Sequence, residues 1–213
     1  MDIRYPIRTV VSTLDGPVLE VLARTTRPLT GREVHRLART GSSSGVRLVL
    51  ARLAEQGIVY SEHRATAVFY AANRDHLAWT AIETLANLRR TLLQRLLTEF
   101  ESWQLPPLHA SLFGSTARAD GDVTSDIDIL LIRPDGVAED ESPWADQVDR
   151  LRRLVMVWTG NRCQAFQLDR QRLAAHVHAQ DPLIDSLLRD AITLAGPELR
   201  VALRNLPALE GER

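Results

Sequence analysis

Apolar positions recur every three or four residues over much of this chain, which predicts helices, and short β-prone runs interrupt them. In the first 75 residues the pattern predicts three helices, over 17–23, 32–39 and 44–56. It then predicts a hairpin with strands over 58–60 and 68–70. Thr30 and Glu33 have the spacing of a capping box, so they set the start of the second helix. Gly57 ends the third helix.

Residues 75–103 lack glycine and proline and carry one apolar stripe, so they predict a single long helix. A helix of about 28 residues would be about 42 Å long. That length suits a connector between two domains, and it equally suits a homodimer paired along the stripe. Pro106 and Pro107 then end the helix and mark a domain boundary.

The second half alternates strands and helices. We expect strands over 108–113, 125–132, 162–168 and 192–195, with helices near 116–119, 144–158, 170–176 and 182–189. These elements predict a small mixed sheet with helices on one side. The fold class is therefore α+β with two domains, divided as 1–74, a connecting helix over 75–104, a second domain over 105–203 and a tail over 204–213.

Composition changes this picture only in part. The chain has 213 residues, 45% hydrophobic and 25% charged, with a net charge of −1. No apolar run approaches the roughly 18–20 residues of a membrane span. The first residues lack the pattern of a signal peptide, so we expect a cytoplasmic protein that does not contact membranes. Cys163 is the only cysteine, which excludes an internal disulfide and a multi-cysteine zinc site.

The charges are unevenly distributed. All 26 basic residues are arginine, so chemistry that needs a lysine amine is excluded. Residues 1–100 hold 14 arginines against 9 acids, and residues 101–213 hold 12 against 18. A basic half followed by an acidic half indicates two modules with different partners.

Candidate chemistry is concentrated between residues 108 and 132. Asp126 and Asp128 alternate on a predicted strand, so both carboxylates point to one face, where they suit a hard divalent cation. Gly114 lets the backbone approach a phosphate, and Ser115 offers a hydroxyl and an amide at the start of a short helix. Arg118 is suited to offset charge on a triphosphate.

The order of these residues resembles the signature of the nucleotidyltransferases of the DNA polymerase β superfamily, above all their small minimal branch in bacteria and archaea. The match covers Gly114, Ser115, Ala117, Arg118, Ser125, Asp126, Ile127 and Asp128, with Ala119 where the family usually has glycine. The resemblance implies a mixed-sheet nucleotidyltransferase fold over about residues 105–200. It also implies metal-dependent transfer of a nucleoside monophosphate from an NTP, by expectation ATP, to a hydroxyl of unknown identity.

In that resemblance Asp126 and Asp128 are catalytic and hold Mg²⁺ or Mn²⁺, while Gly114, Ser115 and Arg118 bind the nucleotide. Such enzymes usually add a third carboxylate from a later strand, and the strand over 162–168 has none. Gln164 stands at the expected place, with Gln167 as an alternative. Asp169 follows the strand and is better placed to cap the next helix.

The first 75 residues resemble the winged helix-turn-helix domains of bacterial regulators. The resemblance implies DNA binding through the third helix, by Ser43, Ser44 and Arg47, and through the hairpin, by Arg64. A helical protein-binding module of the same shape is the alternative for this half.

Two functions remain open for the whole chain. The first is a nucleotidyltransferase enzyme coupled to a DNA-binding winged helix, and in a variant of it the winged helix presents a protein or RNA acceptor to the active site. The second is a DNA-binding transcriptional regulator whose second domain is degenerate and either senses nucleotide or is inactive.

Overall fold

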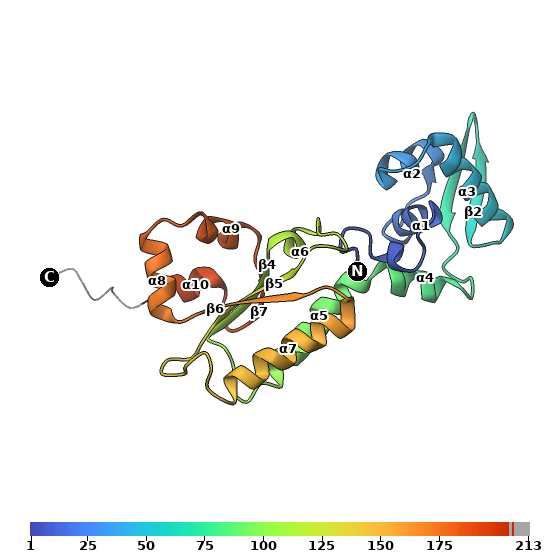
Figure 1. Ribbon diagram of the computed structural model, residues 1–213. Coiled ribbons are helices and arrows are strands. Elements are labelled where there is room, and N and C mark those ends of the chain that lie inside the picture. The colour runs from blue at the N-terminus through green and yellow to red at the C-terminus, as the bar shows by residue number, and fades with distance from the viewer. Residues whose placement is uncertain (205, 207–213) are drawn as a thin grey trace. The chain divides into compact units, whose positions relative to one another are not determined.

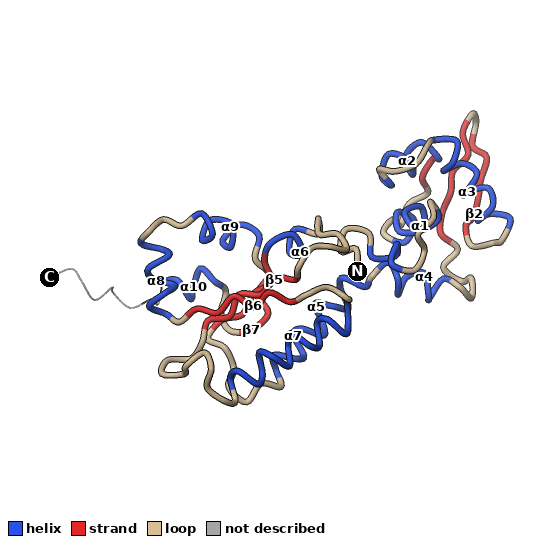
Figure 2. Tube along the Cα trace, in the orientation of Figure 1, coloured by secondary structure: helices blue, strands red, loops and turns tan. Residues whose placement is uncertain are grey.

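The computed structural model describes residues 1–204 and 206, and the chain belongs to the α+β class. Its contacts divide it into two compact units, which we describe separately. The N-terminal unit comprises residues 4–91 together with Asp2, and the C-terminal unit comprises residues from Leu92 onward together with Met1 and Ile3. Figure 1 labels the elements of both units, and Figure 2 separates helices from strands. The predicted tail over 204–213 lies almost wholly outside the described residues.

The N-terminal unit packs helices against a three-stranded antiparallel sheet of order β1-β3-β2. Thr30 Oγ1 accepts a hydrogen bond from the Glu33 amide, and the Glu33 carboxylate accepts one from the Thr30 amide, so the predicted capping box is confirmed. Its elements are η1 (Pro6–Thr9), α1 (Asp15–Ala23), β1 (Leu29–Thr30), α2 (Gly31–Ala38), α3 (Ser43–Glu55), β2 (Val59–Arg64), β3 (Ala67–Ala72) and α4 (Trp79–Ala86).

The long helix predicted over 75–103 is two helices, α4 and α5 (Leu88–Glu101), and the boundary between the units falls within α5. Asn87 is the C-cap of α4: its backbone leaves the helical conformation, with φ −105° and ψ 13°, and its side-chain amide donates to the Glu83 carbonyl. The apolar stripe is divided as well: Ile82 is buried in the N-terminal core, while Leu92, Leu96 and Phe100 are buried in the C-terminal core. These four residues of the stripe that was predicted to pair a homodimer are therefore buried within the cores of the units.

The C-terminal unit contains a mixed four-stranded sheet of order β6-β5-β4-β7, in which β5 and β6 are parallel and the other pairs are antiparallel. Its remaining elements are β4 (His109–Phe113), α6 (Gly114–Arg118), β5 (Ile127–Ile132), α7 (Trp144–Thr159), β6 (Cys163–Leu168), α8 (Arg170–His178), α9 (Pro182–Asp190), β7 (Ile192–Ala195) and α10 (Leu199–Arg204). The strand predictions are confirmed to within two residues at each end.

Helices cover both faces of this sheet, so the prediction of helices on one side was wrong (Figures 1 and 2). Because side chains alternate along a strand, Ile127, Ile129 and Leu131 pack in the core with α5 and α7. Leu130 and Ile132 point to the other face and pack in the core with α8, α9 and α10. Among the described residues, no helix is long and apolar enough to cross a bilayer.

Candidate functional site

The predicted site lies where β4 passes into α6, beside the start of β5. Phe113 pairs with Asp128 across the antiparallel β4–β5 ladder, so the next residue, Gly114, lies directly against the Asp128 side chain. Gly114 has a φ of +67°, and a Cβ on it would collide with the Asp128 carboxylate. Glycine is thus required here both by the backbone and by the lack of space.

Replacing Gly114 by alanine is expected to lower the free energy of unfolding by about 2–3 kcal/mol, because left-handed strain and overpacking act together. Gly160 is the matched control, since its φ is +75° and a Cβ there would meet no atom within 4 Å. Gly160→Ala should therefore cost only about 1 kcal/mol, from the backbone alone. Urea unfolding of both variants measures the difference, and equal costs would contradict the close approach to Asp128.

The two aspartates differ in their surroundings. Asp126 lies just before β5 and is exposed, while Asp128 is half-buried on the strand. Burial raises the pKa of the Asp128 carboxyl, and the neighbouring Asp126 charge raises it further, whereas Arg118 acts in the opposite direction. Neither carboxylate forms a hydrogen bond or an ion pair with any residue that the structure describes. The pair is therefore a negative charge that only the more distant Arg118 offsets in part.

The loop over 120–125 that leads to Asp126 is held by several hydrogen bonds. Asn161 Nδ2 donates to the carbonyls of Asp122 and Ser125, at 3.3 and 2.9 Å. The Ile3 amide donates to the Gly121 carbonyl at 3.0 Å. The Met1 amine in turn donates to Asn161 Oδ1 at 2.5 Å. The first residues of the chain thus support the loop before the aspartate pair.

Ser115 and Arg118 come from the five-residue helix α6. Ser115 is half-buried. The Arg118 guanidinium lies 3.1 Å from Asp120 and 3.7 Å from Asp190, so two carboxylates already surround it. Part of its charge is therefore balanced by acids of the same unit.

The place of the third carboxylate is occupied by an amide. In the parallel β5–β6 ladder Asp128 pairs with Gln164, which is exposed. Gln167 pairs with Leu131 farther along the strand and is hydrogen-bonded to Trp144 and Glu139. Asp169 caps α8, as expected, by accepting from the Arg172 amide at 2.7 Å. In the described part of the chain there is no cluster of three or more His, Cys, Asp or Glu side chains that could hold a metal ion.

The residues predicted to bind DNA belong to the N-terminal unit. Ser42 caps α3, and Ser43 and Ser44 follow in its first turn. Arg47 is exposed on the same helix. Arg64, at the end of β2, is paired with Glu62 at 2.6 Å and lies over the Phe69 ring, so its charge is offset within its own hairpin.

Comparisons with known proteins do not supply a family. No family model matches the chain, and no curated protein matches it. A solved structure that matches is the crystal structure of human N-acetylserotonin methyltransferase in complex with SAM, at 17% identity and a TM-score of 0.29. The match covers 47% of this chain and 34% of that one. At this similarity it supports no argument on fold or activity.

These findings correct the assignment made from the residue pattern. The resemblance to nucleotidyltransferases and to winged helix-turn-helix regulators is withdrawn, since no family model and no curated protein supports either. ATP, DNA and a homodimer as partners are withdrawn with it. Mg²⁺ or Mn²⁺ is withdrawn also, because Gln164 stands beside Asp128 where a third acid was needed.

Among the buried charged groups that the residue pattern missed are Arg133 and Glu20. Arg133 follows β5 and is 5% exposed, and Glu20 in α1 is 4% exposed. Burial raises the pKa of Glu20 to about 7, although Arg24 lies beside it. Neither residue has a signal in the sequence, because nothing in the local pattern indicates that a charge will be covered.

Proposed function

We propose that the C-terminal unit is a ligand-binding domain that takes a small organic cation at Asp126 and Asp128. The observation that carries the proposal is the lack of any hydrogen bond or ion pair on either carboxylate among the described residues, at a site where burial raises the pKa of Asp128. Two adjacent acids favour a positively charged ligand, since each lowers the energy of a cation placed between them. A carboxyl with a raised pKa is also a common feature of functional sites.

Asp128 is the half-buried member of the pair, so water screens its attraction for a cation less than it would at an exposed carboxylate. Gly114 has no side chain and lies against Asp128, and Ser115 offers a hydroxyl from α6. A primary or secondary amine fits this arrangement, because it carries a positive charge and N–H donors for the two carboxylates.

The probes are ethylamine, putrescine and spermidine, titrated into the full chain and followed by calorimetry. Binding is expected to strengthen as the pH rises through the pKa of Asp128, because only the ionised carboxylate attracts the cation. Asp126→Asn should weaken amine binding about tenfold and lower the pKa of Asp128, since the neighbouring negative charge is removed. Carboxyl NMR of Asp128 measures that shift directly.

The matched control is Asp140→Asn, which removes an exposed acid from the loop after β5. It should leave both the amine affinity and the Asp128 pKa unchanged. Equal weakening by the two variants would mean that the amines respond to net charge alone. That outcome would reject Asp126 and Asp128 as the site.

We also propose that the two units are separately folding domains. The supporting observation is that each has its own buried core, one centred on α1, α2 and α3 and the other on the four-stranded sheet. Two separate unfolding transitions would support this proposal. The Leu96→Ala variant described in the Discussion shows which transition belongs to the C-terminal unit.

A further inference from the structure

A second polar pocket lies at the carboxyl ends of the two parallel strands of the C-terminal unit. Arg133 directly follows β5, and Asp169 directly follows β6. The pocket has a volume of about 480 Å³ and is lined by residues 133–137 and 169–171. Ligands of open α/β sheets commonly bind beyond the carboxyl ends of parallel strands. Asp126 and Asp128 lie at the opposite end of β5, so the two sites are separate.

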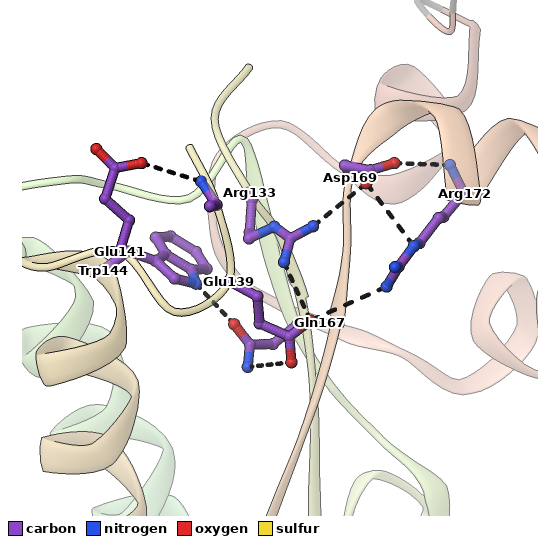
Figure 3. A network of polar contacts seen from close by, with 8 residues as sticks. Arg133, Glu139, Glu141, Trp144, Gln167, Asp169 and Arg172 are labelled. Carbon is purple, nitrogen blue, oxygen red and sulfur yellow. Dashed lines mark hydrogen bonds and ion pairs between the residues drawn. The ribbon is translucent and has the colours of Figure 1, made fainter. Parts of the chain in front are cut away.

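The base of this pocket is a buried arginine. The Arg133 side chain is 6% exposed, with one Nη 3.2 Å from Glu139 and the other 3.2 Å from Asp169 (Figure 3). Its Nε is buried and finds no hydrogen-bond acceptor among the described residues. A buried donor without an acceptor is costly and rare in native proteins. One buried donor of this arginine is therefore left without an acceptor.

The surrounding polar groups hold this arginine in place. Gln167 donates to Glu139 at 3.2 Å and accepts from the Trp144 indole at 2.6 Å (Figure 3). Asp169 caps α8 by accepting from the Arg172 amide, and its carboxylate also accepts from Arg133. Asp169 thus positions the guanidinium.

The rim of the pocket carries one charge of each sign. Asp135 is exposed there and Arg170 is partly exposed, and their closest contact is 3.5 Å, which is long for an ion pair. With Arg133 and Asp169, the lining holds two positive and two negative groups. A lining with no net charge disfavours an anion or a cation alone, while rim groups of both signs favour a ligand that carries both.

We propose that this pocket binds a free α-amino acid. Its carboxylate accepts hydrogen bonds from Arg133 Nε and Arg170, and its ammonium group pairs with Asp135. Nε is covered by neighbouring atoms, so this contact requires a small rotation of the Arg133 side chain. The ligand replaces the long contact between Arg170 and Asp135 by two contacts of its own, and supplies the oxygen that Nε lacks.

The test uses the full chain with the twenty free L-amino acids, each titrated up to 10 mM and followed by calorimetry and by the Arg133 Nε–H signal in NMR. We expect at least one amino acid to bind and to shift that signal. Its analogue without the amino group and its analogue without the carboxylate should each bind at least tenfold more weakly. For alanine these analogues are propionate and ethylamine.

Two rim residues supply variants that keep the buried arginine. Asp135→Asn and Arg170→Gln should each weaken amino-acid binding about tenfold, and Arg152→Gln, on the exposed side of α7, should not. If no amino acid binds, or if Asp135→Asn binds an amino acid with full affinity, the proposal is overturned. Putrescine binding is measured in the same variants and should be unchanged, so failure here is distinguishable from failure at Asp126 and Asp128.

Discussion

Leu96→Ala is expected to lower the free energy of unfolding of the C-terminal unit by about 2–5 kcal/mol, the usual cost of removing a fully buried leucine. Leu96 lies on α5 and is 0% exposed within the core shared with α7 and the sheet. The loss combines the transfer of its methyl groups to water with the cavity that remains. Urea unfolding followed by tryptophan fluorescence and by circular dichroism measures the change.

Leu97→Ala is the matched control, because Leu97 is the next residue of the same helix and is 41% exposed. It should change stability by less than about 1 kcal/mol. If the units are separate domains, Leu96→Ala should shift one unfolding transition and leave the other in place. A single transition that shifts as a whole would contradict that division.

Arg133→Met is expected to destabilise the C-terminal unit by about 2–4 kcal/mol. Methionine keeps most of the buried apolar volume, but Glu139 and Asp169 lose a covered guanidinium that donates to both. The cost falls below that of a wholly buried ion pair, because these two carboxylates are 52% and 38% exposed and water partly replaces the lost donor. Urea unfolding at neutral pH gives the measurement.

Arg172→Met tests whether the burial of Arg133 is the reason for the large cost of Arg133→Met. Arg172 lies 3.9 Å from the same two carboxylates but is 63% exposed, so its removal should cost less than about 1 kcal/mol. Added salt should reduce the Arg172 effect and leave most of the Arg133 effect. Equal costs for the two variants would show that the buried position of Arg133 contributes nothing.

Local elements followed closely from local patterns. The Thr30 and Glu33 spacing defines the start of α2, since a capping box needs only residues three positions apart. Alternation on β5 placed Ile127 and Ile129 opposite Asp128, because side-chain direction on a strand has a period of two. Gly114 beside a turn was also recognised, although its contact with Asp128 depends on a strand that comes later in the chain.

Longer-range features could not be read in the same way. The helix over 75–103 looked continuous because its apolar period is continuous, yet Asn87 ends α4 and the stripe enters two different cores. Helices on both faces of the sheet were missed, because a fully apolar strand such as Ile127–Ile132 does not reveal how many layers cover it.

The candidate site shows the same difference between local features, which the sequence predicts, and longer-range features, which it does not. The order of Gly114, Ser115, Asp126 and Asp128 correctly indicated a strand, a turn and a returning strand, but the family inferred from that order is not supported by any family or curated match. Arg118 was interpreted as a phosphate ligand, whereas Asp120 and Asp190 surround it. Asp190 is 72 positions away, so only the fold brings it there.

By itself the sequence determined most of the helices and strands, several of their caps, and the side of β5 on which Asp128 lies, because these depend on neighbours within a few residues. Only the tertiary structure decided which charges are covered and which are left without a partner. Arg133 is one arginine among 26 in the sequence, and its burial between Glu139 and Asp169 depends on the parallel pairing of β5 with β6. The burial of a side chain and the balance of charge around it depend on residues that are distant in the chain. These two properties are the basis of the roles proposed for Arg133 and Asp128.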